Sequence, residues 1–80
     1  MPQKVYSMSI RFDEIGERLK AYRLGRGLSA EEVAESLDIS RAAVYRIESG
    51  GVVKIETLER LAAILKTSVA SLLGATVEEA

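Results

Sequence analysis

The segment from Ser29 to Gly51 contains the start and stop signals of two short helices, and their spacing constrains the fold more than any other feature. Ser29 and Glu32 have the spacing of a capping box, in which each side chain binds a free amide at a helix start. The residues "LDIS" then interrupt the helical pattern, Ser40 can cap a second helix, and Gly50 and Gly51 end it. Two helices of about two turns joined by so short a turn must cross steeply. The segment therefore predicts a helix-turn-helix.

Apolar residues three or four positions apart predict further helices on both sides of that segment. One runs from Asp13, as its N-cap, to Gly25; a fourth helix spans about 55–66, and a short fifth runs from a Ser68 cap to Gly74. Five short helices favour a cluster of crossing helices over an up-and-down bundle. The residues expected to face inward are Ile15, Leu19, Tyr22, Val33, Ala34, Leu37, Ile39, Val44, Ile47, Ile55, Leu58, Leu61, Ala62 and Leu65.

The composition argues against several classes of function. Eighty residues are enough for one small domain. The chain has no cysteine and no histidine, so it lacks a disulfide framework, a histidine metal site and the groups most used in nucleophilic and general-base catalysis. No apolar run approaches the ~18 residues of a membrane span, and no signal peptide is evident. We therefore expect a cytoplasmic domain that is not an enzyme, with no cofactor, metal, membrane partner or small-molecule ligand.

The spacing of the predicted helices resembles that of a known family. "IGERLKAYRLGRGLSAEEVAESLDISRAAVYRIESG" resembles the first to third helices of the phage repressor and Cro (Xre-type) transcription regulators, and "IETLERLAAILKTSVASLL" resembles their fourth and fifth. The resemblance covers about residues 13–73. It implies an all-α fold, a compact five-helix lambda-repressor-like DNA-binding domain over 13–74. An N-terminal arm or short strand over 1–12 precedes this domain, and a C-terminal tail over 75–80 follows it.

The resemblance also implies a function, which is sequence-specific binding of double-stranded DNA by a transcriptional regulator, with a repressor as our first interpretation. The expected partners are a palindromic operator and a second copy of the chain, forming a homodimer. The alternative is a protein-interaction module that keeps the fold without binding DNA. Cations lost from the third helix would indicate that alternative, and Arg41 and Arg46 argue against it.

The third helix, residues 40–49, is the expected recognition helix. At roughly 100° per residue, Ala43, Val44 and Ile47 point to one side, and Arg41, Ala42, Tyr45, Arg46 and Ser49 to the other. Arginine can make two hydrogen bonds to guanine in the major groove, and an alanine methyl can contact the methyl group of thymine. The residues expected to contact DNA are Ser29, Ala30, Ser40, Arg41, Ala42, Tyr45, Arg46, Ser49 and Lys54.

Three positions depart from the usual pattern of the family. Ala30 stands where a glutamine commonly contacts phosphate, Asp38 stands where the turn usually has glycine, and Lys66 stands where glycine often ends the fourth helix. Aspartate tolerates a left-handed backbone better than most residues do, so the turn is expected to form at some cost.

Charge along the chain is segregated, although its formal net charge is only −1. Residues 18–27 hold four cations and no acid, and residues 39–54 hold three cations and one acid. The acids concentrate in 28–38 and 55–80. Because screening acts over ~8 Å at physiological salt, the local patch decides whether phosphate is bound. We expect DNA binding through one face, with weaker non-specific affinity than a basic protein would have.

Glu48 lies near the C-terminal end of the third helix, where an acid is unfavourable without a partner. In the resembling family the matching glutamate pairs with a basic residue of the first helix, which corresponds to Arg23. The resemblance therefore implies a structural pair between Arg23 and Glu48 that joins the first and third helices.

Residues 5–12 alternate between apolar and polar positions, which is the period of a strand. No other segment shows that period, so we expect this strand to pair with the same segment of a second chain. Two alternatives remain. In the first, the arm is disordered and the chain dimerises through Val69, Leu72, Leu73 and Val77 of the fifth helix and the residues after it. In the second, the arm becomes ordered only on DNA, where Lys4 and Arg11 contact phosphates.

Overall fold

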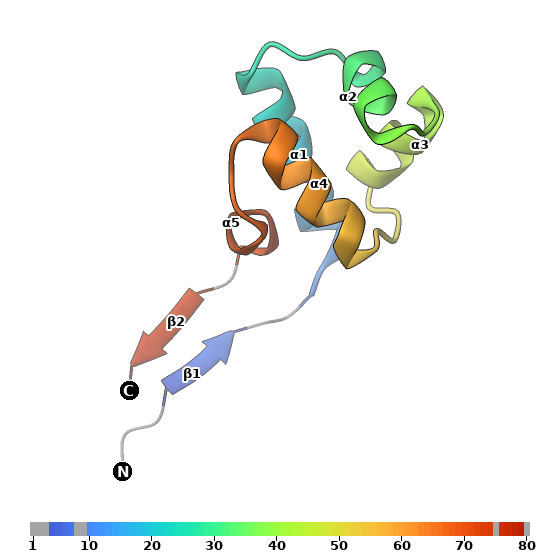
Figure 1. The fold of residues 1–80 in the computed structure, drawn as a ribbon. Coiled ribbons are helices and arrows are strands. Elements are labelled where there is room, and N and C mark those ends of the chain that lie inside the picture. The colour runs from blue at the N-terminus through green and yellow to red at the C-terminus, as the bar shows by residue number, and fades with distance from the viewer. Residues whose placement is uncertain (1–3, 8–9, 75, 80) are drawn as a thin grey trace.

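The computed structural model describes residues 4–7, 10–74 and 76–79, and it shows a body of five helices from which a two-stranded ribbon extends (Figure 1). The helices are α1 (Phe12–Gly25), α2 (Ala30–Leu37), α3 (Arg41–Glu48), α4 (Ile55–Leu65) and α5 (Val69–Leu73). The ribbon consists of β1 (Lys4–Ser7) and β2 (Thr76–Glu79). In the described part of the chain, no helix has the length and apolar character needed to cross a membrane.

Serine side chains begin three of the helices, as the sequence predicts. At the start of α2, Glu32 N donates to Ser29 Oγ at 3.0 Å and Ser29 N donates to Glu32 Oε1 at 3.1 Å, which completes the capping box. Ala43 N donates to Ser40 Oγ at 3.1 Å, and Ser71 N donates to Ser68 Oγ at 3.0 Å. These bonds satisfy amides that have no partner within the helix.

The first helix begins earlier than the sequence predicts. Its N-cap is Arg11, which is extended, and Ile15 N donates to Arg11 O at 3.0 Å to close the first turn. Asp13 lies inside that turn, where Arg11 Nη2 donates to its Oδ2 at 3.1 Å. This hydrogen bond lowers the pKa of Asp13, so its small contribution to stability is lost as the pH falls through that lowered pKa.

Two helices end on residues other than glycine that have a left-handed backbone. Asp38 follows α2 with φ 57, and Lys66 follows α4 with φ 56. These are the two positions where the resembling family often has glycine. After each of them the next backbone amide binds a carbonyl of the helix: Ile39 N donates to Ala34 O at 3.0 Å, and Thr67 N donates to Ala62 O at 2.9 Å. The turns therefore form without glycine, at the cost of some backbone strain.

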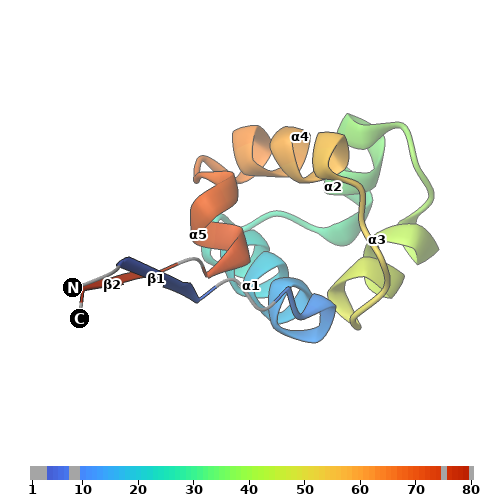
Figure 2. The same ribbon diagram turned by 90° about the horizontal axis from the view of Figure 1, so that it is seen from below.

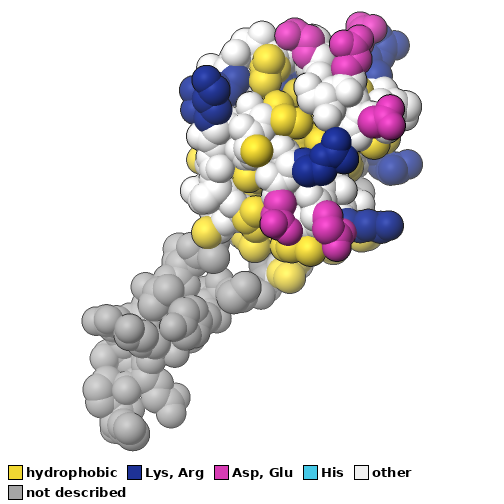
Figure 3. All heavy atoms as spheres, viewed as in Figure 1, with side chains coloured by type: hydrophobic (Ala, Val, Ile, Leu, Met, Phe, Trp, Pro, Cys, Tyr) yellow, Lys and Arg dark blue, Asp and Glu magenta, His cyan; other side chains and the backbone are white. Residues whose placement is uncertain are grey.

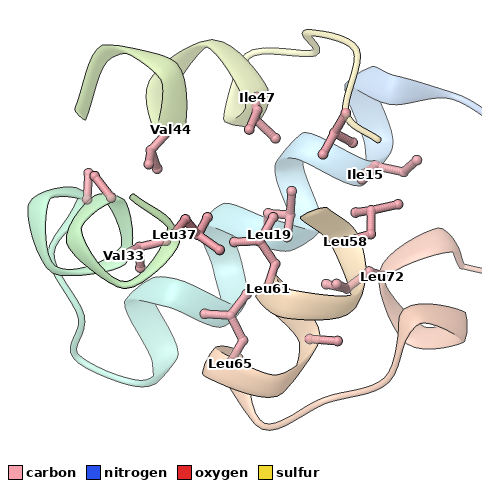
Figure 4. Close-up of a cluster of buried hydrophobic side chains, with 14 residues drawn as sticks. Ile15, Leu19, Val33, Leu37, Val44, Ile47, Leu58, Leu61, Leu65 and Leu72 are labelled. Carbon is pink, nitrogen blue, oxygen red and sulfur yellow. The ribbon is translucent and has the colours of Figure 1, made fainter. Parts of the chain in front are cut away.

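A single cluster of buried side chains joins all five helices (Figure 4). Most of the predicted inward positions are confirmed, including the half-buried Tyr22, which packs against the cluster. Two are not: Ile55 is 52% exposed and Ile39 is 36% exposed. Ile55 is the first residue of α4 and projects from its free end, which explains its exposure. The cluster contains Ile15, Leu19, Ala30, Val33, Ala34, Leu37, Val44, Ile47, Val53, Leu58, Leu61, Ala62, Leu65 and Leu72.

The strand prediction for residues 5–12 is only partly confirmed. The strand covers Lys4–Ser7, residues 8 and 9 lie outside the described residues, and Phe12 belongs to α1. Its partner is β2 of the same chain, in an antiparallel register that places Tyr6 opposite Val77. The expectation that no other segment would form a strand is therefore wrong. Three of the four residues in "TVEE" are polar, so β2 has no apolar alternation to detect.

Candidate nucleic-acid interface

The helices α2 and α3 form the helix-turn-helix that the sequence predicts (Figures 1 and 2). The turn consists of residues 38–40 and reverses the chain through the left-handed Asp38. Ala34 of α2 and Val44 of α3 are both buried, at 3% and 4% exposure. Both residues belong to the buried cluster, which holds α3 on the body and leaves its opposite side at the surface.

The exposed side of α3 contains the predicted site residues. Val44 and Ile47 are buried, whereas Arg41, Ala42, Arg46 and Tyr45 are exposed, the last at 49%. Ser40, which precedes this helix, is exposed, and so is Ser49 at its other end. Among the described residues, neither Arg41 nor Arg46 forms an ion pair or a side-chain hydrogen bond. Both guanidinium groups are thus available to an external acceptor.

The loop between α3 and α4 brings Lys54 to the same surface. Arg46 and Lys54 line one open depression together with Ile39, Ala43, Val52 and Thr57. The loop folds back because Gly51 N donates to Arg46 O at 2.8 Å. A Cβ at Gly51 would lie 3.0 Å from Arg46 Cγ, so glycine permits this close approach to the arginine.

The start of α2 contributes less than the sequence predicts. Ser29 is exposed, but its hydroxyl oxygen already accepts a hydrogen bond from the backbone amide of Glu32. Ala30 is only 3% exposed because its methyl group packs into the core, so its side chain cannot reach a ligand. What α2 presents at this end is the positive end of the helix dipole, with Glu31 and Glu32 in the first turn.

Most cations of residues 18–27 have structural partners, so their side chains are less free to contact a ligand than the composition indicates. Arg18 Nη1 donates to Leu72 O at 3.4 Å, and Arg26 Nε donates to Leu65 O at 3.0 Å and its Nη2 to Lys66 O at 3.2 Å. The last two bonds satisfy carbonyls at the end of α4. Sequence reasoning missed these roles because the contacts join residues 39 or more positions apart.

Arg23 and Glu48 form the predicted structural pair between α1 and α3. Arg23 Nε donates to Glu48 Oε2 at 2.6 Å and Nη2 to Glu48 Oε1 at 3.1 Å, and the two side chains are 9% and 6% exposed. Arg23 Nη1 also donates to Leu28 O at 3.0 Å, in the loop before α2. The hydrogen bonds to Glu48 raise the pKa of Arg23, so its guanidinium stays protonated in the folded chain. One guanidinium therefore connects α1, the α1–α2 loop and α3.

Gly16 provides a second contact between α1 and α3, which sequence reasoning missed. A Cβ at this position would lie 2.5 Å from Glu48 O and 2.6 Å from Ile47 O. The absent side chain lets the end of α3 rest directly on the α1 backbone. A glycine between the inward-facing Ile15 and Leu19 of an amphipathic helix was the available signal.

The described residues, 4–7, 10–74 and 76–79, contain no group of three or more acidic, histidine or cysteine side chains that could hold a metal ion. Every buried polar side-chain atom among them has a hydrogen-bond partner. Among the cations of residues 10–74 that form no ion pair or side-chain hydrogen bond, Arg41, Arg46 and Lys54 are grouped on α3 and the loop after it, whereas Lys20 and Lys66 lie on α1 and at the end of α4.

Comparisons with known proteins agree with this geometry. A family model described as a helix-turn-helix domain matches residues 14–79. The chain is similar to the crystal structure of SinR, the master regulator for biofilm formation, in complex with DNA, with 36% identity, a TM-score of 0.68, and coverage of 74% of this chain and 97% of that chain. SinR is a protein of Bacillus subtilis. No curated protein matches the chain.

Two further structures show the same fold. The restriction-modification controller protein C.AhdI from Aeromonas hydrophila is 29% identical, with a TM-score of 0.71 and coverage of 76% of this chain and 94% of that chain. The clp gene regulator ClgR from C. glutamicum is 29% identical, with a TM-score of 0.73 and coverage of 76% and 80%. The chain belongs to the helix-turn-helix domain family and, within it, to the Xre-type regulators that resemble phage repressor and Cro.

Proposed function

We propose that this chain is a transcriptional regulator that binds double-stranded DNA with α3 in the major groove. The observation that carries the proposal is the exposed arc of α3, where Arg41 and Arg46 have no partner among the described residues and the opposite face is buried. A helix anchored on one side and exposed on the other can enter a groove about 12 Å wide. The similarity to SinR supports the proposal, because that protein was crystallised in complex with DNA.

The residues of this surface divide by chemistry. Arg41 and Arg46 can each donate two hydrogen bonds to a guanine, and Ala42 can place its methyl group against thymine. Tyr45 and Lys54 are exposed beside them and can bind phosphate through a hydroxyl and an ammonium group. Ser40 and Ser29 use their hydroxyls as helix caps, so any contribution they make to phosphate binding comes second to that role. Ala30 is not part of the proposed surface, because its side chain is buried.

We extend the proposal to the assembly. A homodimer would present two copies of α3 to a palindromic operator, because twofold symmetry in the protein matches twofold symmetry in the site. A regulator that occupies such a site acts most directly as a repressor. The modest number of free cations predicts weak non-specific binding with a shallow dependence on salt, because the slope scales with the number of phosphate contacts.

Replacing Arg41 or Arg46 by alanine tests the recognition surface. Loss of a bidentate guanine contact should weaken binding by about 1–3 kcal/mol and relax preference at one operator position. Loss of a phosphate contact should weaken binding to all sequences alike and reduce the slope of affinity against salt by about one unit. Binding isotherms on matched and single-mismatch duplexes, at several salt concentrations, distinguish the two effects. Both positions are exposed helix sites, so alanine should preserve the fold.

Lys66→Ala is the matched control, because it removes the same charge from the end of α4 that lies away from the α3–α4 loop. Its effect on binding should be small. Unchanged affinity in both Arg41→Ala and Arg46→Ala would exclude α3 as the recognition helix. That result would favour the alternative of a protein-interaction module that retains this fold.

A further inference from the structure

Two consecutive glycines follow α3, and the structure requires glycine at each of them for a different reason. Gly50 has a φ of 103, a value that residues with a side chain rarely adopt. Gly51 lies outside that region of φ, so its backbone conformation is open to residues with a side chain. A Cβ on Gly51 would instead lie 2.8 Å from Arg46 O and 3.0 Å from Arg46 Cγ. Glycine is therefore required at position 51 by its contact with Arg46.

We propose that Gly51 is a positioning residue for Arg46. It fixes the direction in which the arginine side chain leaves α3, and so determines which base of an operator the guanidinium group can reach. The proposal rests on the proposed function and deepens it, because it adds a residue that acts on base preference through another side chain.

The contact acts at the start of the arginine side chain. Gly51 N donates to Arg46 O at 2.8 Å, which holds the loop against the last turn of α3. The torsion χ1 sets the position of Cγ, and it normally chooses among three staggered values. Because the Gly51 backbone lies close beside Cγ, fewer of these values remain open to Arg46.

The depression beside the loop supports the same restriction. Arg46 lines it together with apolar side chains from the turn before α3, from α3 itself and from the loop, namely Ile39, Ala43, Ile47, Val52 and Val53. Arginine lays its methylene stem along apolar surface of this kind and keeps its guanidinium in water. In Figure 3, Lys and Arg side chains project outward from the edge of the body at which Figure 1 places α3. The stem of Arg46 is thus held while its charged end stays free.

A held stem favours recognition because a bidentate contact to guanine needs both donors of the guanidinium aligned. An arginine has many rotamers and loses this freedom when it binds, so a stem that is already fixed loses less. Fixing the direction also limits the guanidinium to one base position. Arg41 provides the comparison, because it is the first residue of α3 and does not line the depression. We expect its base preference to be independent of Gly51.

The free chain provides a first test that does not involve DNA. Three-bond couplings across the Cα–Cβ bond of Arg46, measured by NMR, should report one predominant χ1 rotamer in the unaltered chain and a changed or averaged one in Gly51→Ala. Gly50→Ala is the matched control, because it strains the same loop while its Cβ would approach Asp13 and not Arg46. It should leave the couplings of Arg46 unchanged. Couplings that are already averaged in the unaltered chain would overturn the proposal.

Binding to DNA provides the second test. A duplex selected from random DNA by the unaltered chain is compared with its single-base variants, for Gly51→Ala, Arg46→Ala and the double variant. A bidentate contact gives a preference for guanine of about 5- to 150-fold. Gly51→Ala should reduce that preference at least about threefold at the position that Arg46→Ala affects, and by less than about twofold at the position that Arg41→Ala affects. Adding Gly51→Ala to Arg46→Ala should change base preference no further, even if the melting temperature falls.

The other outcomes count against the proposal. Weaker binding to all sequences alike in Gly51→Ala, with base preference intact, would show a merely structural role and overturn the positioning. An equal change of preference in Gly50→Ala would show that any disturbance of the loop has this effect, and would also overturn it. An unaltered chain that selects no DNA site would count against the proposed function, while the couplings of Arg46 would still decide whether Gly51 holds its stem.

Discussion

Glu48→Gln is expected to lower the free energy of unfolding by about 3–5 kcal/mol, because it leaves the buried guanidinium of Arg23 without a negative partner. A domain of this size has a total stability of roughly 4–12 kcal/mol, so the variant loses a large share of it. At about 4–8 °C per kcal/mol, the melting temperature should fall by at least about 12 °C. Thermal and urea unfolding followed by circular dichroism measure the change.

Two companion variants complete this test. Arg23→Gln should destabilise the fold by a similar amount. It leaves the buried carboxylate of Glu48 without a positive partner and also removes the hydrogen bond to Leu28 O. Glu14→Gln is the control, because Glu14 forms only exposed pairs, at 3.6 Å with Arg11 and 3.7 Å with Arg18, and should change stability by less than about 1 kcal/mol. Shifts below about one degree in both Glu48→Gln and Arg23→Gln would show that the pair does not stabilise the fold.

Gly16→Ala is expected to weaken both the fold and the proposed recognition surface. The added methyl group would lie 2.5 Å from Glu48 O and 2.6 Å from Ile47 O, and neither is a flexible side-chain end that can move aside. Overpacking of this kind costs about 1–3 kcal/mol. The end of α3 must move away from α1, so affinity for DNA should fall even at temperatures where the variant remains folded. Thermal melts combined with binding isotherms separate the two effects.

Gly25→Ala is the matched control, because the same substitution in the same helix is not expected to destabilise the fold. A Cβ at Gly25 meets nothing within 4 Å, and the residue lies in the last turn of α1. Alanine there should be neutral or stabilise the chain by up to about 1 kcal/mol, through reduced freedom of the unfolded state. Equal melting temperatures for Gly16→Ala and Gly25→Ala would contradict the close contact between α1 and α3.

The helical part of the fold could be predicted from sequence because its signals are local. The capping box at Ser29, the cap at Ser40 and the left-handed turn at Asp38 each depend on residues only a few positions apart. The apolar period then identifies the buried face of each helix. The exposure of Ile55 could not be predicted in this way, because it depends on what lies beside the free end of α4.

In the candidate site, too, the features that depend on local sequence were predictable and those that depend on distant contacts were not. The exposed arc of α3 follows from its own period, so the availability of Arg41 and Arg46 was predictable. The sequence does not distinguish the cations of residues 18–27 from those of α3, but Arg26 binds carbonyls at the end of α4 and Arg18 binds the end of α5. Charge counted along the sequence cannot separate cations with distant structural partners from free ones. The close contact of Gly51 with Arg46 was missed for a related reason, since the Gly50–Gly51 pair indicates only the end of a helix.

The strands β1 and β2 pair although they are about 70 residues apart, so no local sequence pattern predicts the pairing. The alternation that predicted β1 extends over residues 5–12, whereas the four residues of β2 include only one apolar residue, Val77. The period of β1 was therefore visible in the sequence, but its partner within the fold was not.

Selection of binding sites from random duplex DNA by the full chain tests whether α3 recognises a DNA sequence. Recognition through α3 should enrich one palindrome, with guanines at positions that lose preference in Arg41→Ala or Arg46→Ala, and half-sites about one DNA turn apart. Enrichment should disappear when both arginines are replaced. A pool that remains random after several rounds, or one whose enriched sequence is unchanged by the double replacement, would contradict DNA recognition through α3.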